Sequence, residues 1–160
     1  MNKSKKPNYI RTSRPAKNLL FRWIKDDLKK IGRVQSIGDI GCAELAFYTW
    51  FDAEEYYAYD IDPQRPQRAS ESFDEAINVK ELDITKYATD KKHDLIFCIQ
   101  VMIGNLSFTM DSKKEAINNL INSTDFGGRI IFNIKASALE IDSIKTILME
   151  KFENLSIKKY

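Results

Sequence analysis

The sequence predicts an α/β fold, a doubly wound and mostly parallel sheet with helices on both faces. Strand-like and helical apolar patterns alternate along the whole chain. Residues 93–102, HDLIFCIQVM, form a continuous apolar run that suits a central strand buried on both faces. Residues 34–62 are typical of a βαβ unit, because a strand leads through a glycine turn into a helix and then into a strand with acids at its end.

Length and composition favour one domain. With 160 residues and 43% hydrophobic content, a chain of this size can bury a sizeable core. We expect a basic flexible arm over 1–13 and one domain over 14–160. The two cysteines indicate neither a zinc site nor a disulfide framework, and no apolar run is long enough for a membrane span or a signal peptide. We expect a cytoplasmic protein that does not associate with a membrane.

Charge is distributed unevenly. The first 33 residues contain eleven Lys or Arg and two acids, a balance of +9, so the remainder carries 14 basic and 21 acidic side chains, a balance of −7. Such asymmetry favours a polyanion, above all a nucleic acid, as a partner of the basic segment. For residues 1–13 a solubilising disordered tail is an equally good interpretation.

The first half of the chain predicts a helix, a strand, a second helix and a second strand. Ser13 is a candidate cap, and apolar residues at helical spacing from Leu19 to Ile31 predict an amphipathic helix that ends near Gly32. A strand over 34–41 then leads to a helix over 43–51 and a strand over 55–62.

The second half continues the alternation. Pro63 and Pro66 predict a loop, followed by a short helix over 67–76 and a strand over 77–84. After the apolar strand, Asp111 or Ser112 would cap a helix, and a Gly-Gly break at 127–128 would precede a fifth strand over 129–136. Asp142 would cap a last helix that reaches about residue 152, and 154–160 could add a final strand. His93 and Lys92 are interpreted as solvated residues that precede a strand.

Asp60 is the acid at the end of the βαβ unit. It lies 19 residues after Gly41. That spacing places a carboxylate beside the ribose hydroxyls of a nucleotide cofactor whose other end lies over the glycine turn. The alternative is an ordinary α/β turn with an exposed aspartate.

Five segments, in order along the chain, resemble the motifs of the class I, Rossmann-like S-adenosylmethionine-dependent methyltransferases. They are SIGDIGCAEL, YAYDIDP, ELDI, HDLIFCIQVMIGNL and LINSTDFGGRIIFNI. The resemblance implies S-adenosyl-L-methionine as cofactor and a methyl transfer that needs alignment more than side-chain chemistry, without a metal.

The same resemblance implies where the cofactor would lie. The methionine and ribose parts would lie along Asp39, Gly41, Cys42 and Ala43, with the ribose diol on Asp60. The adenine would be flanked by Ile61 and Asp62 and would meet Asp83 and Ile84 at its amino edge. The wall beneath the sulfonium would consist of Ile99, Gln100 and Val101, and Gln100 would orient the acceptor.

Two features depart from the family. Ala43 and Leu45 occupy positions that are usually glycine, and Leu45 could narrow the space beside the methionine tail. The segment after the last helix has room for only one of the two closing strands, which predicts an incomplete sheet with an edge open to a protein partner. These departures leave open a degenerate, non-catalytic member of the fold.

The basic helix before the first strand resembles, more loosely, the helix that precedes the first motif in messenger-RNA cap guanine-N7 methyltransferases. RNA or another anionic acceptor is therefore the expected substrate. Its candidate contacts are Arg14, Lys17, Asn18, Arg22 and Lys25. A generic amphipathic helix explains the pattern nearly as well. An NAD-dependent oxidoreductase remains a further alternative, although a complete G-x-G-x-x-G is missing.

Overall fold

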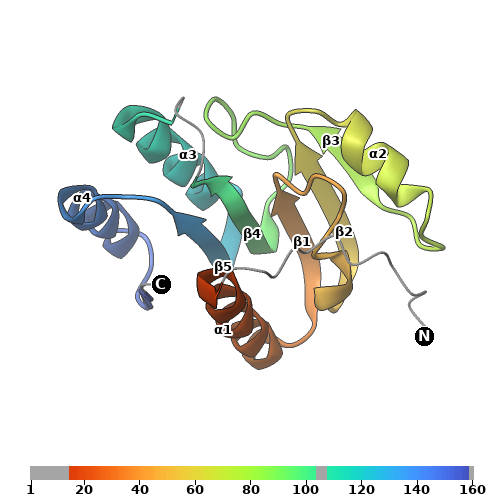
Figure 1. Ribbon diagram of the computed structural model, residues 1–160, viewed down its shortest axis with the longest axis horizontal. Helices are drawn as coiled ribbons and strands as arrows, with labels where there is room; N and C mark the ends of the chain where they lie inside the picture. The colour runs from red at the N-terminus through yellow and green to blue at the C-terminus, as the bar shows by residue number, and fades with distance from the viewer. Residues whose placement is uncertain (1–14, 104–107, 159–160) are drawn as a thin grey trace.

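The computed structural model describes residues 15–103 and 108–158, and these form a five-stranded sheet of order β3-β2-β1-β4-β5 (Figure 1). All four pairs of neighbouring strands are parallel. The strands are β1 (Val34–Ile40), β2 (Ala53–Asp60), β3 (Asn78–Glu81), β4 (His93–Met102) and β5 (Thr124–Ile134). The strand order reverses between β1 and β4, which confirms the predicted doubly wound sheet and places a topological switch point at their carboxyl ends.

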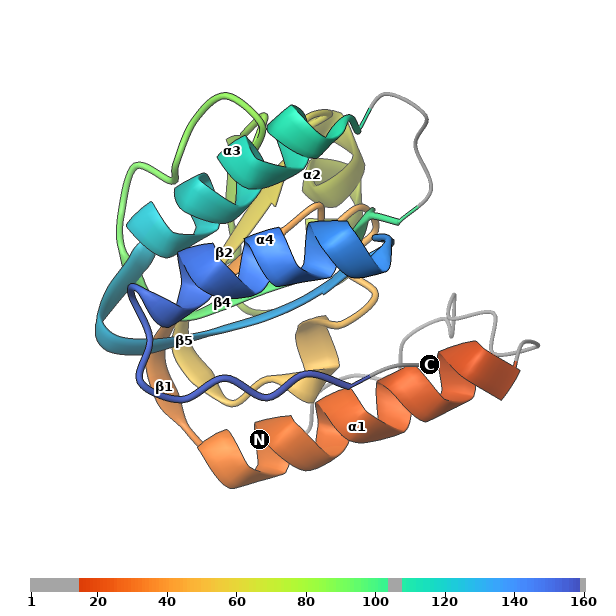
Figure 2. The same ribbon diagram turned by 90° about the vertical axis from the view of Figure 1, so that its left-hand side faces the viewer.

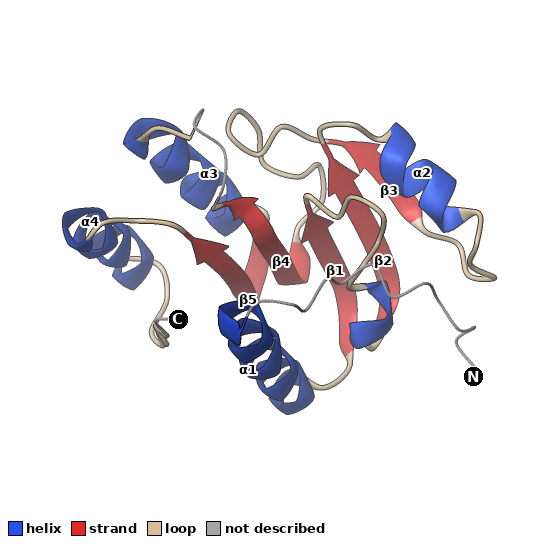
Figure 3. Ribbon diagram, viewed as in Figure 1, coloured by secondary structure: helices blue, strands red, loops and turns tan. Residues whose placement is uncertain are grey.

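Helices cover both faces of the sheet (Figures 1 and 3). On one face, α1 (Pro15–Ile31), the short 3-10 helix η1 (Tyr48–Trp50) and the end of α2 (Gln64–Ser70) pack against the sheet in an α1-side core. On the other face, α3 (Met110–Asn122) and α4 (Ala138–Met149) enclose an α3-side core. Strand β4 serves both, because Leu95 and Phe97 point into the first core and Ile96 and Cys98 into the second.

Helix α1 forms as its periodicity predicts. Leu20, Ile24 and Leu28 recur on one face and are buried in the α1-side core. The helix ends at Gly32, which has φ of +72° and donates its N–H to the Leu28 carbonyl at 3.0 Å. Figure 2 shows α1 beneath the sheet, in an orientation antiparallel to the strands. The candidate cap Ser13 and the predicted arm over 1–13 lie outside the described residues.

The predicted helix over 43–51 is wrong. Residues 43–47 form turns, and only Tyr48–Trp50 is helical. The reason is local, because Ala43 and Leu45 have φ of +47° and +58°, and such left-handed residues interrupt a right-handed helix.

The second half of the chain shows smaller differences. Helix α2 starts at Gln64, three residues earlier than predicted, and α3 and α4 are capped by Thr109 and Ser137 rather than by the residues proposed. The Gly-Gly pair lies inside β5, where a register shift opposite the start of β4 and a φ of +74° at Gly127 mark an irregularity.

No strand follows α4 in the described part of the chain. Residues 150–158 run from α4 past β5 towards α1 (Figure 2), where Lys158 donates to Asp27 at 2.8 Å. Strand β5 therefore has no second neighbour among the described residues. Within that part of the chain no helix combines the length and apolarity needed to cross a membrane.

Candidate functional site

The carboxyl ends of β1, β2 and β4 meet at the switch point and carry most of the predicted site residues. In the register of β1 and β2, Ile40 pairs with Tyr59, so the Gly41 turn lies beside Asp60. Strand β4 lies on the other side of β1 and brings Gln100 and Val101 to the same edge.

Gly41 makes the turn possible. Its φ is +68°, and its N–H donates to the Tyr59 carbonyl at 2.7 Å. A Cβ at this position would lie 2.3 Å from Cγ2 of Val101. The β1 turn is therefore pressed against the end of β4 with no room for a side chain.

Asp60 holds the turn through backbone hydrogen bonds. Oδ2 accepts from the Ala43 N–H at 2.9 Å, and Oδ1 accepts from the Asp62 N–H at 3.0 Å. Each carboxylate oxygen has a second lone pair, so a further donor can still bind to each. The residue is 7% exposed, so access to these oxygens is narrow.

Ala43 and Leu45 keep the left-handed conformation that suits glycine. This conformation costs an L-residue about 1–2 kcal/mol. The Leu45 side chain is 1% exposed and packs in the α1-side core. The two departures from glycine thus preserve a glycine-like backbone, and the bulk of Leu45 is accommodated in the core.

Asp39 lies buried below the turn. It is 1% exposed and accepts a hydrogen bond from the Tyr56 hydroxyl. Burial raises the pKa of its carboxyl to about 7; the Tyr56 hydrogen bond opposes the shift, and the charge of Asp60 adds to it. Burial also raises the pKa values of Cys42 and Cys98 far above the usual thiol range, so neither thiol is a nucleophile near neutral pH.

Strand β4 ends in a bulge that Asn133 stabilises. The register with β5 shifts between Cys98 and Met102, and Gln100 has φ of +68°. The Gln100 N–H donates to Oδ1 of Asn133 at 2.6 Å, and Asn133 is 6% exposed. Sequence reasoning did not single out Asn133. Its signal was a lone amide in the apolar run RIIFNI.

Asp83 joins this end of the sheet because the Leu82 N–H donates to the Asp60 carbonyl at 2.9 Å. Its carboxylate caps Thr85 and pairs with Lys86 at 2.9 Å, and the hydrogen bonds from these two residues lower its pKa.

The remaining predicted cofactor contacts differ in exposure. Ile61 is 66% exposed, and Asp62 is exposed with Oδ1 accepting from the Gln64 N–H. Ile84 is buried in the α3-side core, and its carbonyl accepts from Asn119. Ile99 is buried in the α1-side core. The side chains of Ile84 and Ile99 therefore support the sheet from within.

The predicted substrate contacts spread along α1. Asn18, Arg22 and Lys25 are exposed, whereas Lys17 is half-buried with Nζ 6.0 Å from the Phe21 ring. Lys25 lies over the Trp50 ring at 4.5 Å, near the start of β1 and away from the Gly41 turn. Arg14 lies outside the described residues.

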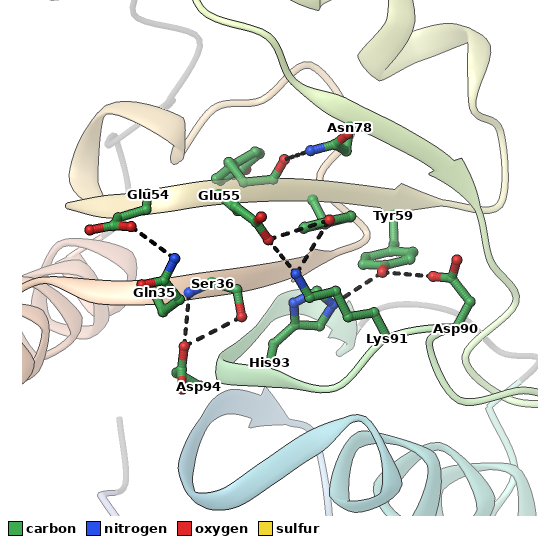
Figure 4. Close-up of polar contacts among 12 residues, drawn as sticks. Gln35, Ser36, Glu54, Glu55, Tyr59, Asn78, Asp90, Lys91, His93 and Asp94 are labelled. Carbon is green, nitrogen blue, oxygen red and sulfur yellow. Dashed lines mark hydrogen bonds and ion pairs between the residues drawn. The ribbon is translucent and has the colours of Figure 1, made fainter.

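A second polar cluster surrounds His93, at the start of β4 (Figure 4). His93, expected to be solvated, is instead fully buried, and its Nε2 lies 3.0 Å from the Tyr59 hydroxyl, which also donates to Asp90. Asp94 accepts from the Ser36 N–H at 2.8 Å. Burial lowers the pKa of His93 to about 4, and among the described residues its Nδ1 has no hydrogen-bond partner.

Comparison with known proteins finds no matching family model and no matching curated sequence, but it finds clear structural neighbours. The N-methyltransferase NodS from Bradyrhizobium japonicum WM9, in complex with S-adenosyl-L-homocysteine, superposes with a TM-score of 0.69 at 22% identity over 87% of this chain and 76% of that one. A TehB-like S-adenosylmethionine-dependent methyltransferase from Corynebacterium glutamicum gives 0.55 at 17% identity over 82% of both chains.

An S-adenosylmethionine-dependent methyltransferase from Clostridium acetobutylicum gives a TM-score of 0.56 at 20% identity over 81% of this chain. This chain spans only 54% of that protein. These superpositions show the architecture: the chain has the fold of the class I S-adenosylmethionine-dependent methyltransferases.

Proposed function

We propose that the chain is an S-adenosyl-L-methionine-dependent methyltransferase whose cofactor binds at the carboxyl ends of β1, β2 and β4. One observation carries the proposal: the Asp60 carboxylate lies at the carboxyl end of β2, directly beside the left-handed turn that Gly41 makes possible. A carboxylate that can accept from two hydroxyls, next to such a turn, fits a ribose diol with its attached chain.

Charge at this edge supports a cationic cofactor. Asp60 and Asp62 lie there, while Asp83 is paired with Lys86 at 2.9 Å and the nearby cation Arg65 is paired with Glu44 at 2.6 Å. A positive sulfonium gains from this surplus of carboxylates, whereas a pyrophosphate loses from it.

The residues at this site would hold the cofactor and align the acceptor rather than act as an acid or a base. When bound, S-adenosylmethionine supplies a methyl group already activated by its positive sulfur. Asp60 would accept from the ribose hydroxyls, and the β4 bulge would place Gln100 towards the acceptor. The Gln100 amide can donate and accept hydrogen bonds, so it can orient a nucleophilic nitrogen or oxygen, and alignment carries the rate.

For the acceptor we propose an anionic molecule, with RNA as the class that the basic first 33 residues favour, including a cap-like guanine N7. Support comes from their charge of +9 and from the exposed Arg22 and Lys25 on α1. If RNA binds through this segment, affinity must fall as salt rises, and removal of residues 1–14 must make that dependence shallower. Affinity that stays constant from about 50 to about 300 mM salt would rule out the basic segment as the contact.

A non-catalytic binding subunit is the second candidate. Both Asp60 oxygens already accept backbone hydrogen bonds, and the residue is 7% exposed, so the turn could be self-contained. In this case the edge of β5, which has no second neighbour among the described residues, would be the place for a protein partner.

NAD is disfavoured by the segment after the turn. A dinucleotide pyrophosphate binds at the N-terminus of an α-helix that follows the glycine turn. Here the turn leads through residues 43–47 into the three-residue η1, so such a helix end is missing from the described site.

Calorimetric titration with S-adenosylmethionine, S-adenosylhomocysteine and NAD tests the three functions. We expect binding of the first two and a loss of about tenfold or more in Asp60→Asn, since one charged acceptor for the ribose is removed. Asp74→Asn, at an exposed site on the loop after α2, is the matched control. Binding of NAD alone would exclude the proposal, and binding of none of the three would favour the non-catalytic subunit.

A further inference from the structure

A cavity of about 370 Å³ lies at the opposite end of the sheet from the Gly41 turn. It lies between the carboxyl-terminal half of α1, η1 and the starts of β1 and β4, and it is partly open to solvent. Its lining includes Lys25, Leu28, Lys29, Val34, Trp50 and Leu95. None of the proposed cofactor contacts lines it, so it requires an explanation of its own.

The floor of the cavity is apolar, and its aromatic wall is rigidly packed. Leu28 and Leu95 belong to the α1-side core. Trp50 is held edge-on by Phe21 and Phe47, with ring centroids 5.5 Å and 4.9 Å away. A flat apolar group can therefore be buried here without rearranging the wall.

Two lysines lie beside this apolar floor. Lys25 and Lys29 are four residues apart on one face of α1, and in the described part of the chain neither forms an ion pair. Their neighbour Lys30, by contrast, pairs with Asp27 at 3.7 Å. Like charges at i and i+4 repel each other, and an anion between them would relieve the repulsion. Asp52, also in the lining, is exposed and forms no ion pair with either lysine.

We propose that this cavity binds a flat aromatic ring carrying a phosphate or carboxylate. The ring would lie on the floor beside Trp50, and the anionic group would bind between the ammonium groups of Lys25 and Lys29. The volume is at the lower end of the range for small-ligand sites, which suits one or two fused rings. This site shares Lys25 with the proposed RNA-binding segment, but it contains none of the proposed cofactor contacts and does not depend on methyl transfer.

Titration with 1-naphthyl phosphate tests the site, with 1-naphthol and inorganic phosphate as ligands that lack the charge and the ring. We expect 1-naphthyl phosphate to bind best, and Lys25→Gln/Lys29→Gln to lose about tenfold or more in affinity because two charge-assisted contacts are removed. Lys30→Gln is the matched control, from the same helix but outside the lining. The inference is overturned if the wild type does not bind, or if the double variant binds as tightly as the wild type.

Two additional measurements locate the ligand and its source. Binding of 1-naphthyl phosphate must survive Asp60→Asn, and its loss in that variant would move the ligand to the carboxyl-end site and overturn the inference. Competition with uridine monophosphate and with a short oligouridylate decides whether a free nucleotide or an RNA end carries the recognised ring and phosphate. Displacement by either one supports the proposed chemistry.

Discussion

At the carboxyl end of the sheet, three non-glycine residues have positive φ and a buried carboxyl lies beneath them, whereas a network of paired side chains surrounds His93 at the start of β4. Left-handed residues are costly and persist only where surrounding contacts impose them. Strain is therefore concentrated where the cofactor is proposed to bind. The Tyr59–Asp90 contact and the ion pairs of Lys80 and Lys91 tie strands β2 and β3 to the loop that precedes β4.

The two ends also differ in the sign of their pH dependence. Asp39 keeps its proton in the folded protein to a higher pH than in the unfolded chain, and His93 loses its proton at a lower pH. Buried Asp39 is protonated at low pH, and its contribution to the free energy of unfolding is lost as pH rises. His93 is buried in its neutral form, so the free energy of unfolding decreases as pH falls. Each end can thus be perturbed separately.

The largest effect is expected from Asp39→Asn. The folded pKa of about 7 against 3.8 unfolded implies that the wild type loses on the order of 4 kcal/mol between about pH 4 and pH 8 through this group. The amide keeps an acceptor for Tyr56 but cannot ionise. Urea unfolding at both pH values should therefore show that the free energy of unfolding of the variant increases relative to that of the wild type as pH rises. A difference that is the same at both pH values would contradict a buried, protonated Asp39.

Gly41→Ala should lower the free energy of unfolding by about 3 kcal/mol, because overpacking against Val101 adds to the left-handed penalty. Gly32→Ala is the matched control. It has φ of +72°, but no atom lies within 4 Å of the place that the new methyl group would occupy, so only the conformational penalty of about 1 kcal/mol applies. Equal losses of free energy of unfolding in the two variants, measured by urea unfolding, would show that the Val101 side chain moves aside without a cost in stability.

His93 should make the amino end sensitive to acid. Its pKa falls from 6.5 unfolded to about 4 folded, so the unfolded chain binds more protons in that window. Stability should decline by on the order of 3 kcal/mol from about pH 7 to pH 4 through this residue. His93→Gln should flatten this part of the profile, and a wild-type decline that persists in the variant must come from other groups.

The sequence predicts those features whose structural cause lies within the same segment, and it misses those that depend on contacts with distant residues. The bounds of β4 follow from its apolar run, and the end of α1 follows from Gly32, because both signals are contained in the segment itself. The helix over 43–51 was wrong because the residues there have ordinary helical propensity, and only the packing of Leu45 and the hydrogen bond from Ala43 to Asp60 impose left-handed turns. The bulge at Gln100 likewise depends on Asn133, a residue 33 positions away.

Asn133→Leu should separate the bulge from the rest of the carboxyl end. The Gln100 N–H would lose its acceptor, at a cost of about 2 kcal/mol. Because Val101 would shift against Gly41, affinity for S-adenosylhomocysteine should fall more than stability alone explains. Asn122→Leu, at the exposed end of α3, is the control. Unchanged affinity in a destabilised Asn133→Leu would limit Asn133 to a structural role.

The smallest effect is expected from Ala43→Gly, which tests whether the left-handed turn is strained at Ala43 or stabilised by packing of its methyl group. Glycine adopts φ near +47° without steric conflict, so Ala43→Gly should relieve about 1–2 kcal/mol of left-handed strain. The greater entropy of glycine in the unfolded chain returns about 0.5–1 kcal/mol, which leaves a small net gain in stability. Its N–H still donates to Asp60, so affinity for S-adenosylhomocysteine should be kept. A net loss of stability in thermal and urea unfolding would mean that the Ala43 methyl group is packed rather than strained. In that case the departure from glycine stabilises the turn, and the non-catalytic interpretation of the site gains ground.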